Sequence, residues 1–64
     1  MTRKDLANIF KEKREKKNLT QAEVAKKAGL NTNYYAVIER GEINPSFETF
    51  NKICNALGLT LSLH

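Results

Sequence analysis

The side chains with the most obvious chemical potential in this sequence are cations, and they are concentrated near one end. Eleven Lys and Arg against seven Asp and Glu give a formal net charge of +4. Residues 1–20 carry seven of the basic and three of the acidic groups, whereas residues 41–64 carry one basic and two acidic groups. A positive stretch of this size attracts phosphate or anionic lipid. Its plainer interpretation is the solvated face of a helix, so charge nominates nucleic acid without establishing it.

The sequence contains few residues suited to catalysis or metal binding. Cys54 is the single cysteine and His64 the single histidine, so neither an internal disulfide nor a zinc site can be completed. Paired carboxylates and a glycine-rich phosphate loop are not visible in the sequence. Cys54 falls on the apolar stripe of a helix expected at 47–57, where it fits a small buried hydrophobe better than a redox group. We therefore expect no enzyme activity, metal or cofactor.

Length and composition indicate one small globular domain. Sixty-four residues can build a single, thin core, and 41% apolar residues argue against disorder. No apolar run approaches the roughly 18 residues of a membrane helix, and no apolar region follows residues 1–5 as in a signal peptide. Because the free thiol also fits a reducing compartment, we expect a cytoplasmic protein.

Four helices can be predicted from apolar spacing and from capping residues. Thr20 can cap the N–H of Glu23, and Glu23 can reach back to the N–H of Thr20. Asn31 and Ser46 are placed to cap two further helices, and Asn18 suits a left-handed terminating position. The expected helices are residues 3–17, 21–28, 32–40 and 47–57, ended by Asn18, Gly29, Gly41 and Gly58.

The joint between the second and third helices is the most informative part of the sequence. Ala25 lies where the two helices approach most closely, and only a small side chain fits there. Gly29 supplies the dihedral angles that let the chain turn sharply. This is the layout of a helix-turn-helix, although an αα-corner without a ligand has the same spacing.

Several segments, taken together, resemble the Cro/CI-type (XRE) helix-turn-helix family. They are Leu19-Thr20-Gln21, Val24-Ala25, Ala28-Gly29-Leu30, Tyr35, Ile38-Glu39-Arg40-Gly41 and Asn44-Pro45-Ser46. The resemblance runs from about residue 6 to residue 59. It implies an all-α, lambda-repressor-like bundle of four or five helices, a single domain over 1–64, with the helix-turn-helix at 21–40 and the recognition helix at 32–40. Tyr35 departs from the family, which more often has an aliphatic residue there, so its hydroxyl needs a partner or solvent.

The family binds operator DNA, usually as a dimer, and its recognition helix enters the major groove by its N-terminal turns. Asn33 can pair bidentately with adenine N6 and N7, and Thr32 can offer its hydroxyl or its methyl group. Ala36 and Val37 suit thymine methyl groups, unless they are plain helix filler. Because no arginine stands in the first two turns of this helix, we expect a half-site that leans toward A·T.

Contacts to DNA phosphates are expected around the same helix. The family has a phosphate contact at the position of Gln21, which opens a helix where free N–H groups favour an anion. Tyr34, Arg40 and Asn44 resemble further backbone-contacting positions. The lysines of residues 1–20 and Lys26-Lys27 are expected to supply diffuse attraction instead of defined contacts.

The resemblance also implies a structural ion pair. In the family, the residues that match Arg14 and Glu39 often form a partly buried pair. The alternative is two solvated charges whose interaction is worth about 0–1 kcal/mol.

The last residues alternate apolar and polar side chains, which is the period of a strand. A lone strand has no partner in an all-helical monomer, so its simplest partner is its own copy across a two-fold axis. Leu59, Leu61 and Leu63 then form the dimer interface, as in the HipB-like antitoxin branch that this ending resembles. A short helical turn that packs Leu61 and Leu63 is the alternative.

Two functions follow from these expectations. The first is a repressor that binds a palindromic operator in double-stranded DNA as a homodimer. The second is an antitoxin that binds a toxin protein and autoregulates its operon.

Overall fold

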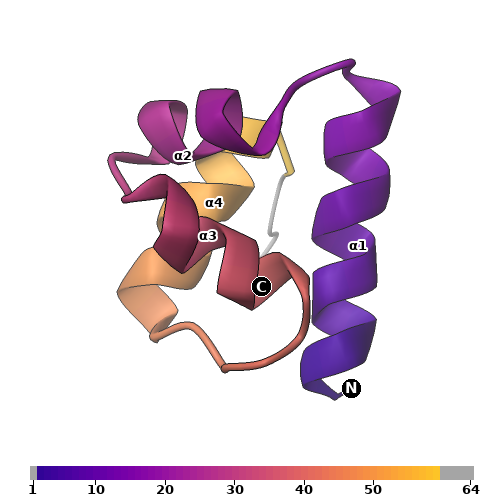
Figure 1. Cartoon of the computed structure of the whole chain (residues 1–64), viewed down its shortest axis with the longest axis vertical. Helices are drawn as coiled ribbons and strands as arrows, with labels where there is room; N and C mark the ends of the chain where they lie inside the picture. The colour runs from indigo at the N-terminus through magenta and orange to yellow at the C-terminus, as the bar shows by residue number, and fades with distance from the viewer. Residues whose placement is uncertain (1, 60–64) are drawn as a thin grey trace, which may run out of the picture.

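The computed structural model describes residues 2–59, which form an all-α fold (Figure 1). Its helices are α1 (Arg3–Lys16), α2 (Gln21–Ala28), α3 (Thr32–Glu39) and α4 (Phe47–Leu57). None of the helices in this part of the chain is long and apolar enough to cross a membrane. The predicted fold class is confirmed, and each predicted helix is present.

The helices start where side chains can cap them. Thr20 Oγ1 accepts the backbone N–H of Glu23 at 3.1 Å, and Glu23 Oε1 accepts the N–H of Thr20 at 2.8 Å, which is the predicted capping box. Asn31 Oδ1 accepts the N–H of Asn33 at 2.8 Å, at the start of α3. A capping box at the start of α1, between Thr2 and Asp5, was not predicted.

Helix ends differ slightly from the prediction. The first and third helices end one residue early, at Lys16 and Glu39, because Lys17 and Arg40 take the C-cap positions. Asn18 has the predicted left-handed conformation, with a φ of 56°. Such one-residue differences are within the usual uncertainty of a helix boundary.

The core lies among the four helices. In Figure 1, α1 runs along one side of the molecule, and α2, α3 and α4 are grouped beside it. The largest fully buried side chains come from all four helices and are Tyr35, Phe10, Ile38, Ile53, Leu57 and Val24. The Phe10 ring also packs on Phe50, with 5.9 Å between the ring centroids. Each of these side chains other than Tyr35 stabilises the fold by about 1.5–3 kcal/mol when buried.

The predicted dimer contacts fall at the edge of the described chain. Leu59 is half-buried and packs against the core of its own chain. Leu61 and Leu63, and with them the choice between a strand and a helical turn, lie outside the described residues.

Candidate nucleic-acid interface

The turn between α2 and α3 fixes how α3 is presented. Ala25 is fully buried, and its carbonyl accepts the N–H of Leu30 at 2.8 Å. Gly29 is left-handed, with a φ of 70°. A Cβ added there would meet nothing within 4 Å, so glycine is needed for its dihedral angles and not for space. These are the two features that the sequence predicted for a helix-turn-helix joint.

Helix α3 buries one face and exposes its N-terminal turn. Thr32, Asn33 and Tyr34 are exposed, and Val37 is half-buried. Ala36 is only 8% exposed, so little of its surface is available to a base. Of the four predicted base-contacting residues, Thr32 and Asn33 are thus the most exposed, and the accessible surface of α3 is centred on them.

Glu39, at the end of α3, is the buried charge of this region. Arg14 donates to its carboxylate from Nε at 2.9 Å and from Nη2 at 2.7 Å. Gln21 Nε2 donates to the same carboxylate at 3.3 Å. Burial acts to raise the pKa of Glu39, but the hydrogen bonds, with Arg14 first, lower it below its usual range. The pair expected from the family is thus present as a bidentate salt bridge that joins α3 to α1.

The residues proposed to contact phosphate occupy different surroundings. The Gln21 side chain is half-buried, and its amide is partly engaged by Glu39. Tyr34 and Asn44 are exposed. Arg40 is exposed as well, but its guanidinium forms an ion pair with Glu42.

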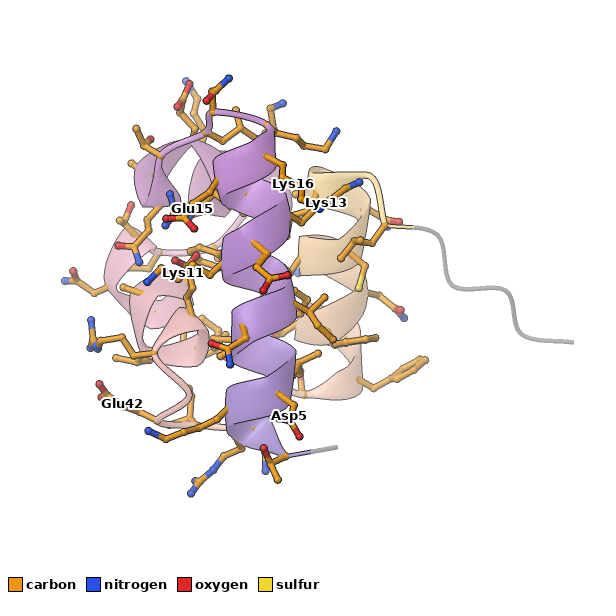
Figure 2. The ribbon with its side chains drawn as sticks, turned by 90° about the vertical axis from the view of Figure 1, so that its right-hand side faces the viewer. Asp5, Lys11, Lys13, Glu15, Lys16 and Glu42 are labelled. Atoms are coloured by element: carbon orange, nitrogen blue, oxygen red, sulfur yellow. The ribbon has the colours of Figure 1, made fainter. Side chains whose placement is uncertain are left out.

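An open hollow of about 650 Å³ lies between α1, the start of α2 and the end of α3. It is lined by side chains that are all polar or charged, four of them basic: Lys4, Asn8, Lys11, Arg14, Gln21, Glu39, Arg40 and Glu42. Figure 2 shows Lys11 and Glu42 on one side of α1, whereas Lys13 and Lys16 lie on the other side. Glu39 and Glu42 pair with Arg14 and Arg40, so Lys4 and Lys11 leave the hollow with an excess of positive charge near the start of α2, where an anion is favoured.

The sequence profile described as helix-turn-helix matches residues 10–63. The chain belongs to the Cro/CI-type helix-turn-helix family. This membership confirms the family predicted from the sequence. That α2 and α3 form the helix-turn-helix, with α3 as its recognition helix, stays a prediction.

Three relatives are similar over most of this chain. An "Immunity repressor protein" of Bacillus phage phi105 is 43% identical over 49 residues, which are 77% of this chain and 34% of the relative. An "ImmF control region 10 kDa protein" of the same phage is 37% identical over 60 residues, which are 94% of this chain and 67% of the relative. The "Uncharacterized HTH-type transcriptional regulator y4dJ" of Sinorhizobium fredii is 36% identical over 58 residues, or 91% of this chain and 75% of the relative. This chain thus spans about a third of the phage repressor's length. No solved structure was found to match it.

Sequence reasoning missed the part of this helix-turn-helix surface that α1 contributes. Lys4, Asn8 and Lys11 all line the hollow, although the lysines were expected to act only as diffuse charge. Their spacing of four and three residues places them on one face of a helix. This polar stripe was visible in the sequence, but its position beside Arg40 and Glu42 depends on the tertiary fold.

Proposed function

We propose that this chain is a repressor that binds a palindromic operator in double-stranded DNA as a homodimer. The observation that carries the proposal is the exposed N-terminal turn of α3, presented by a helix-turn-helix joint beside a hollow lined with cations. The names of two relatives, an immunity repressor and a transcriptional regulator, support the same function. The protein then acts in the cytoplasm, where its operator is found.

In this proposal α3 reads the bases. Asn33 reads adenine through its amide, and Thr32 contacts the neighbouring base through its hydroxyl or methyl group. Val37 contacts a thymine methyl group. Ala36 is mostly buried, and its small side chain allows α3 to approach the bases closely. The operator leans toward A·T because α3 has no arginine in these positions.

The residues around α3 hold the DNA backbone. Gln21, Tyr34, Arg40 and Asn44 contact phosphates, which fix the register of α3 without reading sequence. Leu59, Leu61 and Leu63 join two copies, so that two α3 helices reach two half-sites of a palindrome.

A change at Arg40 tests the phosphate contacts. Arg40→Ala should weaken binding to mixed-sequence DNA and reduce the slope of log affinity against log salt by about one unit. Fluorescence anisotropy with a labelled duplex at several salt concentrations measures both quantities. An unchanged slope removes Arg40 from the interface, and no binding of the wild-type protein to any duplex rejects the proposed function.

The alternating leucines at 59, 61 and 63 favour a second candidate, an antitoxin that also binds a toxin protein. The two functions are compatible, because an antitoxin of this family can repress its own operon through α3. The product of the adjacent gene distinguishes them: its co-purification with this chain and the loss of its toxicity in the complex would support the antitoxin.

A further inference from the structure

The ion pair between Arg40 and Glu42 lies in the hollow beside α3, where a DNA phosphate is proposed to bind. Arg40, a proposed phosphate contact, forms a salt bridge with Glu42. Both side chains are about half exposed, at 54% and 53%. The Glu42 carboxylate is therefore bound to the Arg40 guanidinium, the group that would bind a DNA phosphate.

The fold holds Glu42 in this position through its backbone. The Glu42 N–H donates to the carbonyl of Val37 at 3.1 Å, and the Glu42 carbonyl accepts Nη1 of Arg3 at 3.3 Å. The preceding Gly41 is left-handed, and a Cβ there would lie only 3.0 Å from Cγ of Lys4. The connection after α3 thus lies close against α1, and the backbone of Glu42 is held beside Arg40.

The surroundings of Glu42 contain further cations. Lys4, Lys11 and Arg40 line the same hollow, and Lys4 is close enough to help lower the pKa of Glu42, after the larger effect of the Arg40 hydrogen bond. The other acidic group of the hollow, Glu39, is buried and forms a salt bridge with Arg14. Glu42 is therefore the exposed negative charge among the residues that line this surface.

Resting on the proposed function, we propose that Glu42 is an internal competitor for the DNA phosphate that Arg40 binds. In the free protein its carboxylate holds the Arg40 guanidinium, and on binding a backbone phosphate replaces it. Glu42 thus keeps non-specific affinity low, because this exchange is required on every DNA sequence.

The direct test is Glu42→Gln in the full chain, which removes the charge and keeps the size of the side chain. The probe is a labelled, mixed-sequence duplex of about 20 base pairs, titrated at about 50 to 200 mM NaCl. Because an exposed ion pair is weak, we expect about fivefold tighter binding at the lowest salt. The gain should shrink as salt increases.

Glu12→Gln is the matched control, since it makes the same change in net charge. Glu12 is exposed and lines a different, smaller hollow with Ile9, Lys13 and Lys16. We expect this control to tighten binding less than about twofold through general charge alone. Equal gains from both variants would overturn the proposal that Glu42 competes at Arg40.

A second comparison asks whether the gain depends on Arg40. In an Arg40→Ala background, Glu42→Gln should tighten binding no more than Glu12→Gln does. A gain as large as in the wild-type background would show simple repulsion instead of competition and would also overturn the proposal. All variants should melt within about 2 °C of the wild type, because exposed charges contribute little to stability. A wild-type protein that binds no duplex would reject the proposed function itself, which is a separate outcome.

Discussion

At the scale of single residues, the buried salt bridge between Arg14 and Glu39 has the largest structural consequences. Glu39 is 6% exposed, and Arg14 also donates to the Leu19 carbonyl at 2.9 Å. A buried pair of this kind is weak evidence for net stability, but removing one partner leaves the other charge buried and costs about 3–5 kcal/mol. Its role here is geometric, because it fixes the end of α3 against α1 and the start of α2.

The same pair predicts how stability depends on pH. The folded-state pKa of Glu39 lies below its ordinary value of 4.5 because the hydrogen bonds, led by Arg14, outweigh burial. A lowered carboxyl pKa stabilises the fold above the unfolded-state pKa, and this contribution is lost as pH falls through the folded-state pKa. We therefore expect the free energy of unfolding to fall steadily as the pH drops below about 4.5.

Urea unfolding at a series of pH values measures this dependence. Glu39→Gln should be less stable at neutral pH and should lose less stability on acidification than the wild type. Glu23→Gln, at an exposed capping box, is the control that shows how much of the pH dependence is lost when an exposed carboxylate is removed. If Glu39→Gln retains the full wild-type pH dependence, Glu39 is not the group responsible.

Tyr35 gives a second prediction at this scale. Its side chain is fully buried, and within residues 2–59 its hydroxyl makes no hydrogen bond. Burial, followed by the neighbouring Glu39, raises the pKa of Tyr35 well above its usual range. Because an unpaired buried hydroxyl is unfavourable, Tyr35→Phe should raise the free energy of unfolding, by up to about 1 kcal/mol. A loss of more than about 1 kcal/mol on urea unfolding would instead reveal a hydrogen bond from the hydroxyl to Glu39.

At the scale of helices, local sequence determined most of what was predicted correctly. Thr20, Asn31 and Ser46 mark three helix starts, and Gly29 and Gly58 mark two ends, because caps depend on neighbours within a few residues. The joint between α2 and α3 was predictable for the same reason. These elements are enough to place a recognition helix but not to orient it.

The features that sequence reasoning missed depend on how helices pack. The eight residues of α3 do not fix its rotation about its own axis, so the burial of Ala36 could not be read from spacing. The hollow brings Lys4 and Lys11 near Glu42, which lies more than thirty positions later in the sequence. No local pattern predicts that these residues meet. Long-range packing also determines the ion pair of Arg14 and Glu39, which was expected only from the family.

The start of α2 supplies a prediction for this scale. Thr20→Ala removes one half of the capping box and should lower the free energy of unfolding by about 1 kcal/mol. It should also weaken DNA binding, because Gln21 at the first helical position is a proposed phosphate contact. Thr20→Ser keeps the hydroxyl acceptor and should preserve both properties. Thermal melting and anisotropy measure them, and equal effects of Ala and Ser would contradict the capping argument.

At the scale of the whole molecule, 64 residues can bury only a limited core, and small cores gain stability from association. The proposed dimer joins two chains through Leu59, Leu61 and Leu63. Deleting residues 61–64 should therefore convert the dimer to a monomer and lower operator affinity. Sedimentation velocity at several protein concentrations measures the change. A dimer that persists in the shortened chain would place the interface elsewhere.

The net charge of +4 acquires a more specific meaning in the folded chain. Lys4 and Lys11 line the hollow beside α3, while Lys13 and Lys16 lie on the other side of α1 (Figure 2). In the proposed function, general attraction to DNA comes from the whole of α1, whereas sequence reading depends on the nearly uncharged first turns of α3. We propose that operator recognition rests on these separate roles of α1 and α3.

Selection of binding sites from random double-stranded DNA tests that claim most directly. The selected pool should contain a palindromic, A·T-leaning site that the wild-type protein binds about 10³-fold or more tightly than mixed-sequence DNA. Asn33→Ala should lose about 1–3 kcal/mol of that preference while keeping non-specific affinity. A pool with no enriched site, or a G·C-dominated site that Asn33→Ala binds equally well, would contradict the account.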